Sequence, residues 1–245
     1  MRLLVSVRDA DEARAAIAGG ADIVDAKEPM LGPLAPVAPG VLHAICAAVP
    51  PVIPLSVALG DARPEQLEGV VTAVAPLRRR GALYFKVALL ASSPSDVAPA
   101  IGRAVHLLRQ RPDRPAFIVA RYVDTPSDTV HLTEWLDVCA ASGAQGLLLD
   151  TSRKDGASLL ATVDAESLTA LRRAAARHGI WLALAGGMTI GDVPLLSGIR
   201  PHVVGARGAA CDGGRTGTLS TTKVAHLRQA LNGISAPLEP LASSA

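Results

Sequence analysis

The sequence predicts a single (β/α)8 barrel, the TIM-barrel fold of the α/β class. Three observations lead to this prediction: strand-like runs alternate with helical segments along the chain, there are eight such runs, and the length is 245 residues. Eight strand–helix units in roughly 250 residues is the usual size of this fold. An apolar fraction of 49% fits one well-buried domain. We assign residues 1–232 to the barrel and residues 233–245 to a flexible C-terminal tail.

The expected strands are short apolar runs, and the segments between them carry apolar residues at helical spacing. In chain order the strands are Leu3–Val7, Asp22–Ala26, Val52–Ala58, Leu83–Ala88, Ala116–Tyr122, Gly146–Asp150, Trp181–Ala185 and His202–Gly205. The helical segments between them include Asp9–Ala18, Pro64–Arg80, Pro94–Arg111, Ala165–His178 and Thr221–Leu231.

An internal repeat supports the barrel. The pair Gly-Ala recurs at Gly20, Gly81 and Gly143, with spacings of 61 and 62 residues, and leads each time into an even-numbered strand. Each spacing holds two units of about 31 residues, as eight units in a barrel of this length require. Glycine suits the left-handed conformation that ends many helices. The alternative fold, an open doubly wound sheet, usually has a glycine-rich turn after its first strand, and this chain has none there.

Composition and charge exclude several classes of protein. The formal net charge is +2, so no strong field attracts nucleic acid or a membrane surface. No apolar run is long enough for a membrane span, and the opening run is too short for a signal peptide. The three cysteines lie far apart, and none of the six histidines has metal-ligand spacing. We therefore expect a cytoplasmic protein without metal or cofactor, whose oligomeric state, homo-oligomers included, stays open.

Lysine is rare in this chain. Only Lys27, Lys86, Lys154 and Lys223 occur among the 24 basic residues. A lysine amine, unlike a guanidinium, can lose its proton near neutral pH and form a Schiff base. Lys223 falls on a C-terminal amphipathic helix and is interpreted as a surface residue.

The other three lysines fall where function is expected, because active sites of parallel barrels lie at the carboxyl ends of the strands. Asp25 and Lys27 share one face at the end of the second strand. Lys86 interrupts the apolar fourth strand, where a buried charge is costly outside a functional cavity. Asp150 ends the sixth strand, with Lys154 following it. Crowded amines favour a neutral, nucleophilic lysine, although these residues alone do not indicate which one.

Two glycine-rich turns follow the last two strands. One contains Gly186 and Gly187, and the other contains Arg207, Gly208 and Ala209. Turns after the seventh and eighth strands are the usual phosphate site of this fold, because their N–H groups point at the anion. We expect all five residues to bind a substrate phosphate, Arg207 through a charge-assisted bond.

Three motifs carry a resemblance to a known family. They are Asp25–Pro29, Asp150–Gly156 and Val204–Cys211. With them, the chain from Leu3 to the last helix resembles the (5-formylfuran-3-yl)methyl phosphate synthases, also called 4-(hydroxymethyl)-2-furancarboxaldehyde-phosphate synthases. The resemblance implies a barrel enzyme, a carbon–oxygen lyase, that condenses two molecules of glyceraldehyde 3-phosphate into a furan aldehyde phosphate for methanofuran biosynthesis, with loss of phosphate and water.

The resemblance also implies roles for the clustered residues. Lys27 becomes the Schiff-base lysine, and Asp25, Lys86, Asp150 and Lys154 become supporting groups. Two other functions stay open: a different Schiff-base aldolase or sugar-phosphate isomerase, and a non-catalytic phosphate-binding barrel with a regulatory role.

Overall fold

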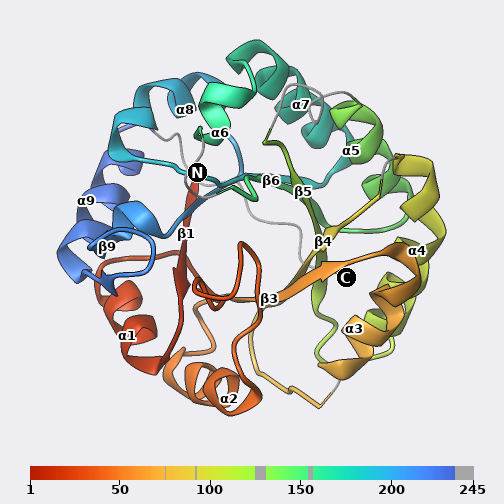
Figure 1. Cartoon of the computed structure of the whole chain (residues 1–245), viewed down its shortest axis with the longest axis horizontal. Coiled ribbons are helices and arrows are strands. Elements are labelled where there is room, and N and C mark those ends of the chain that lie inside the picture. Colours follow the sequence, from red (N-terminus) through yellow and green to blue (C-terminus); the bar gives the residue numbers. More distant parts are fainter. Residues whose placement is uncertain (75, 92, 125–130, 154–156, 235–245) are drawn as a thin grey trace.

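Eight parallel strands close into a barrel, and helices surround it (Figure 1). The computed structural model describes residues 1–245 except 75, 92, 125–130, 154–156 and 235–245. The strands are β1 (Arg2–Val7), β2 (Ile23–Ala26), β3 (Leu55–Ala62), β4 (Leu83–Leu89), β5 (Ala116–Tyr122), β6 (Gly146–Asp150), β7 (Trp181–Leu184) and β8 (Val203–Ala206). Neighbours in the barrel follow chain order, and β1 pairs with β8. The predicted (β/α)8 fold is confirmed.

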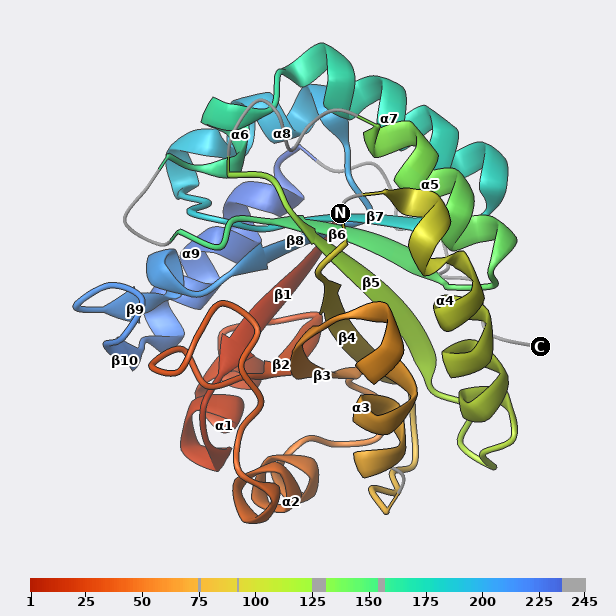
Figure 2. The ribbon, with the colours of Figure 1, turned by 45° about the vertical axis from the view of Figure 1, so that its right-hand side comes forward.

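Helices form the outer layer of the molecule (Figure 2). They are α1 (Ala10–Ala18), α2 (Pro39–Ala48), α3 (Leu67–Ala73), α4 (Pro94–Arg109), α5 (Leu132–Ala141), α6 (Leu159–Thr162), α7 (Ala165–His178), α8 (Val193–Ile199) and α9 (Thr221–Asn232). Short 3-10 helices cover η1 (Pro64–Gln66), η3 (Ile190–Asp192) and η4 (Gly208–Ala210). After β8, the strands β9 (Cys211–Asp212) and β10 (Thr218–Leu219) form a small antiparallel hairpin at the edge of the barrel.

Local sequence sets the ends of several helices. The Asp9 carboxylate accepts a hydrogen bond from the Glu12 N–H and begins α1. Asp164 caps α7 in the same way through the Ser167 N–H, and Gly179 ends that helix with a φ of 67°. Such caps satisfy N–H groups that have no partner within the helix. The predicted positive φ angles at Gly20, Gly81 and Gly143 are confirmed at 87°, 88° and 80°.

The strands separate two apolar cores, because successive side chains of a strand point to opposite faces. The outward side chains, such as Leu3 and Val5 of β1, pack against the helices and are fully buried. The inward side chains form a second, smaller cluster inside the barrel. Much of that inner cluster is alanine: Ala58, Ala88, Ala116, Ala120, Ala183 and Ala185.

Small inward residues leave the barrel hollow. A Cβ atom on Gly205 of β8 would lie 2.9 Å from the Cβ of Ala185, so only glycine fits there. Gly146 of β6 also lines the cavity, where a Cβ atom would lie only 3.1 Å from the Ile118 side chain and 3.2 Å from the Trp181 carbonyl oxygen. TIM barrels usually fill this region with bulky branched residues. The alanines and glycines instead leave room for a cavity among the strands.

The predicted bounds of the third strand and of the helix after it were wrong, and the strand continues to Ala62 rather than ending at Ala58. The third strand begins at Leu55 rather than Val52, because Pro54 lacks an N–H and the Ile53 N–H bonds to the Pro50 carbonyl in a turn. The helix expected to reach Arg80 ends at Ala73, where a proline three residues further on disfavours continued helix. The predicted tail, 233–245, lies outside the described residues from residue 235 on.

Among the described residues, no helix is both long and apolar enough to cross a membrane.

Candidate active site

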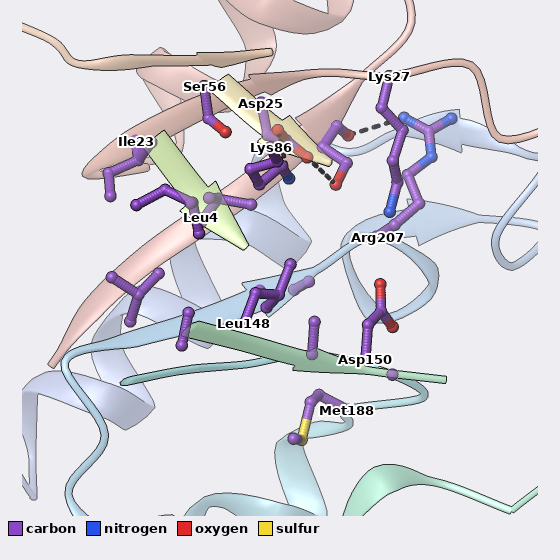
Figure 3. Close-up of a pocket in the computed structure, with 18 of the residues that line it drawn as sticks. Leu4, Ile23, Asp25, Lys27, Ser56, Lys86, Leu148, Asp150, Met188 and Arg207 are labelled. Carbon is purple, nitrogen blue, oxygen red and sulfur yellow. Dashed lines mark hydrogen bonds and ion pairs between the residues drawn. The ribbon is translucent and has the colours of Figure 1, made fainter. Parts of the chain in front are cut away.

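A cavity of about 300 Å³ lies inside the barrel and opens at the carboxyl ends of the strands. We call it the barrel cavity. Inward residues from all eight strands line it, together with the turns after β7 and β8. Its deep part is apolar, with Tyr84 and Trp181 in edge-to-face contact at 5.0 Å between ring centroids. Its outer part carries the charged residues that the sequence singled out (Figure 3).

A buried ion pair crosses the barrel cavity. The Lys86 Nζ lies 2.6 Å from an Asp25 carboxylate oxygen, and the two side chains are 5% and 0% exposed (Figure 3). The other Asp25 oxygen accepts a hydrogen bond from the Ser6 hydroxyl at 2.9 Å. Lys86 and Asp25 stand two strands apart, and the intervening inward residue, Ala58, is small enough to leave the path open. The acid that the sequence associated with Lys27 is thus bonded to Lys86.

Lys27 and Asp150 line the outer part of the same cavity. Lys27 follows β2 directly and is 7% exposed, and its N–H bonds to the Val7 carbonyl at 3.0 Å. Asp150 ends β6 and is 2% exposed. One Asp150 oxygen accepts the Thr151 N–H at 2.8 Å, which fixes the carboxylate at the rim. The structure therefore brings Asp25, Lys27, Lys86 and Asp150 together, while Lys154 lies outside the described residues.

The two glycine-rich turns lie at the mouth of the barrel cavity, as expected. Gly186 has a φ of 101°, and a Cβ atom there would lie 2.8 Å from the Thr151 nitrogen, so the turn requires glycine. Within the described part of the chain, the N–H groups of Gly187, Gly208 and Ala209 donate no hydrogen bond. Exposed, unpaired N–H groups at the end of parallel strands are suited to an anion.

Arg207 occupies the mouth but is fully committed to the protein. Its Nη1 donates to the Ser6 carbonyl at 3.0 Å and to Glu12, and its Nη2 donates to Glu12 at 3.1 Å and to the Gly217 carbonyl at 2.9 Å. Its Nε donates to the Arg215 carbonyl at 2.9 Å. A guanidinium has five N–H donors, and these contacts use all five. The sequence identified the residue at the mouth but not its buried partner, Glu12 of α1.

Arg215 is a cavity-lining cation that the sequence analysis missed. It lies between β9 and β10, is half-buried, and donates from Nη2 to the Gly32 carbonyl at 2.7 Å. Burial lowers the pKa of Arg215, and the carboxylate of Asp150 opposes that effect. A guanidinium still keeps its proton under such conditions. The Gly213-Gly214 pair was a sequence signal that could have indicated it, because these glycines let the chain turn back over the cavity.

Ser56 is a second residue that the sequence did not reveal. It lies on β3 beside Asp25 and Tyr84, and it is 1% exposed. Its hydroxyl lines the barrel cavity and has no hydrogen-bond partner among the described residues. A buried hydroxyl without a partner is costly, so this group is available to a bound molecule.

The described residues contain no group of three or more His, Cys, Asp and Glu side chains that could hold a metal ion.

Comparison with known proteins gives a consistent result. A family profile described as 4-HFC-P synthase matches residues 3–228. The (5-formylfuran-3-yl)methyl phosphate synthase of Methanothermobacter thermautotrophicus is 35% identical over 235 residues, which cover 95% of this chain and 99% of that protein. The protein of the same name from Methanopyrus kandleri is 32% identical over 237 residues, covering 94% and 98%.

Among solved structures, phosphoribosyl anthranilate isomerase from Thermus thermophilus superimposes with a TM-score of 0.59. The match covers 96% of this chain and all of that chain at 21% identity. At that identity the likeness is one of fold.

Proposed function

The chain belongs to the (5-formylfuran-3-yl)methyl phosphate synthase family, and from this premise we propose that it condenses two molecules of glyceraldehyde 3-phosphate through a Schiff base on Lys27. The product would be (5-formylfuran-3-yl)methyl phosphate, the furan precursor of methanofuran, made in the cytoplasm. Two triose phosphates minus one phosphoric acid and two waters give this product, so the reaction needs no oxidant, reductant or cofactor. The class of reaction is that of a carbon–oxygen lyase.

The observation that carries the proposal is the position of Lys27. Its side chain is buried in the barrel cavity, near the mouth and the two anion-binding turns. Lys86, the other described lysine of the cavity, is held 2.6 Å from Asp25, and that pair would have to break before its nitrogen attacked a carbonyl. The Asp25–Pro29 motif, which carries part of the resemblance to the family, also favours Lys27 for imine formation.

The residues around Lys27 supply the remaining steps. The Lys27 nitrogen attacks the aldehyde carbon of one triose phosphate, and water leaves to give an imine. Removal of a proton from the adjacent carbon gives an enamine, which attacks the aldehyde of the second triose. Loss of phosphate and of two waters forms the aromatic ring, and hydrolysis of the imine returns the water lost on its formation and releases the formyl group from Lys27. Asp150, Lys86 and Lys154 are the groups that we propose for proton transfer, with Asp25 holding Lys86 in place.

The substrate phosphates are proposed to bind at the two turns. Gly186 and Gly187 form one site, and Gly208 and Ala209 form the other, through N–H groups directed at the anion. All N–H donors of the Arg207 guanidinium are engaged within the protein. We propose that Arg207 supports the second turn by holding the neighbouring backbone in place.

Trapping of the imine tests the proposal. Borohydride added during turnover should reduce the imine and leave a triose-phosphate mass on the peptide that contains Lys27. Lys27→Arg should abolish both the adduct and the furan aldehyde absorbance, because guanidinium is a poor imine former. Lys86→Arg is the matched control, since it keeps a cation beside Asp25 and should still give the adduct on Lys27. An adduct on Lys86 in the unmodified protein, or a carbonyl product without a furan, would refute the proposal.

A further inference from the structure

Arg215 is unusual among the charged residues of the barrel cavity. Its side chain reaches from the β9–β10 hairpin to the loop after β2, where it meets the Gly32 carbonyl. In the described chain this is its only side-chain hydrogen bond, and no carboxylate forms an ion pair with it. Since a guanidinium carries five donors, four remain for a ligand.

Two other cations of the cavity, Lys86 and Arg207, are committed more fully. Lys86 pairs with Asp25, and Arg207 pairs with Glu12. Arg207 also holds the carbonyls of Arg215 and Gly217, so the hairpin that carries Arg215 is fixed to the barrel. Arg215 is therefore presented by a rigid support while its own donors are available.

Unpaired backbone donors lie next to Arg215. A Cβ atom built on Gly208 would lie 3.7 Å from the Arg215 nitrogen, so the two backbones are in close proximity. The N–H groups of Gly208 and Ala209 donate no hydrogen bond within the described residues. Arg215, Gly208 and Ala209 all line the barrel cavity, so a guanidinium and two N–H groups face the same space. Together they match the oxygens and the charge of a phosphate monoester.

The acids near this position do not neutralise it by contact. Asp150 and Glu28 both act on the charge of Arg215 from a distance, and neither forms an ion pair with it. A carboxylate on the ligand would meet these acids as well, but a dianionic phosphate gains more from the guanidinium and from the N–H groups together.

We propose that Arg215, together with the N–H groups of Gly208 and Ala209, binds a phosphate group of the substrate. The cation of this site thus comes from the hairpin after β8 and not from Arg207. The identification of the ligand as a triose phosphate rests on the proposed function, whereas the capture of a phosphate monoester does not.

The experiment measures binding of two probes, inorganic phosphate and glycerol 3-phosphate, by calorimetry. Glycerol 3-phosphate lacks an aldehyde and cannot form an imine, so its binding is independent of Lys27 chemistry. Arg215→Gln should weaken binding of both probes about 10- to 100-fold, the range for one charge-assisted contact. Arg215→Lys should retain part of the affinity, because it keeps the charge but not the paired donors.

The matched control is Arg63→Gln. Arg63 follows β3 at the same end of the barrel and does not line the cavity. Its replacement by glutamine removes the same charge as Arg215→Gln. It should leave binding of both probes within twofold of the unmodified protein. In turnover with glyceraldehyde 3-phosphate, Arg215→Gln should raise KM more than it lowers kcat.

Equal affinity of Arg215→Gln and the unmodified protein for both probes would overturn the inference. An equal loss in Arg63→Gln would also overturn it, because the effect would then be one of general charge. If the protein makes no furan but loses phosphate binding in Arg215→Gln alone, the proposed function fails and this inference stands.

Discussion

The two ends of the barrel use polar side chains in opposite ways. At the amino ends of the strands, these side chains satisfy backbone groups: Gln145 accepts the Phe117 N–H at 2.6 Å, His202 accepts the Leu182 N–H at 2.9 Å, and Asp22 accepts the Leu3 N–H at 2.7 Å. At the carboxyl ends, Lys27, Lys86, Asp150 and Arg215 face a cavity. Residues of similar chemistry therefore complete the sheet at one end and line a cavity at the other.

The difference teaches where a change should affect stability and where it should affect activity. Side chains at the amino end replace hydrogen bonds that the sheet cannot make, so their loss leaves backbone groups unsatisfied. Apart from Arg207, whose contacts with Glu12 and Ser6 join the two ends of the chain, the polar side chains that line the cavity at the carboxyl end contribute little to closing the barrel. The Asp25–Lys86 pair should affect both stability and activity. It lines the cavity, and each of its two buried charges is neutralised by the other.

The largest expected effect is on activity, at the carboxyl end. Asp150→Asn keeps the shape of the side chain and its contact with the Thr151 N–H but removes a proton acceptor. We expect kcat for furan formation to fall about 10²- to 10⁴-fold, the usual contribution of a general acid or base. Urea unfolding should be nearly unchanged. A variant with full activity would exclude Asp150 from proton transfer, and one that unfolds would place it with the structural residues.

The ion pair should show a large effect on stability. Lys86→Met leaves the Asp25 carboxylate buried without its cation, and removal of one partner of a buried pair costs about 3–5 kcal/mol of unfolding free energy. The double variant Asp25→Asn/Lys86→Met removes the orphaned charge and should recover much of that loss. Urea unfolding of the single and double variants measures the loss of unfolding free energy and its recovery. Additive losses in the double variant would show that the two side chains do not interact.

An effect of intermediate size should appear at the amino end as a pH dependence. Burial lowers the pKa of His202 to about 4 from its ordinary value of 6.5. Between these values the unfolded chain binds more protons, so stability is fully present above pH 6.5 and decreases as the pH falls toward 4. From pH 7 to pH 5 this group should remove about 2 kcal/mol of unfolding free energy.

His202→Gln is the control for that dependence. A glutamine oxygen can still accept the Leu182 N–H but does not titrate. Urea unfolding at pH 7 and pH 5 should show a smaller loss in this variant than in the unmodified protein. Parallel losses in the two proteins would mean that other groups, not His202, produce the pH dependence.

The smallest effect is expected for one backbone hydrogen bond at the amino end. Gln145→Leu leaves the Phe117 N–H without its acceptor, which should cost about 1 kcal/mol, the low end for a group that is only partly buried. Gln145→Glu keeps an acceptor and should cost less. Activity should not change in either variant. A loss of activity without loss of stability would contradict the division between the two ends.

Much of the architecture could be predicted from the sequence because it depends on local patterns. The apolar runs marked the eight strands, and the rule that function collects at the carboxyl ends brought Asp25, Lys27, Lys86 and Asp150 to one cavity. The end of the third helix was harder to predict, since apolar spacing continues past Ala73 while the following proline ends the hydrogen bonding.

The pairing of side chains could not be predicted, because it depends on contacts between distant strands. Asp25 and Lys27 share a face two residues apart, yet Asp25 bonds to Lys86 two strands away. Arg207 was expected to bind an anion, but its guanidinium is paired with Glu12, a residue near the other end of the chain. Arg215 was missed because its position depends on how the hairpin folds back over the cavity.

The closure of β1 against β8 has a consequence for how the molecule is made. Contacts that seal the barrel join residues far apart in the chain, such as Arg207 to Glu12 and to the Ser6 carbonyl, across 195 and 201 positions. During synthesis the first strand therefore remains an unpaired edge until nearly the whole chain has left the ribosome. Such contacts form slowly because a long loop must close first, and an unpaired edge is a site where other chains can add. Production of this protein should thus depend on chaperone capacity more than its final stability suggests.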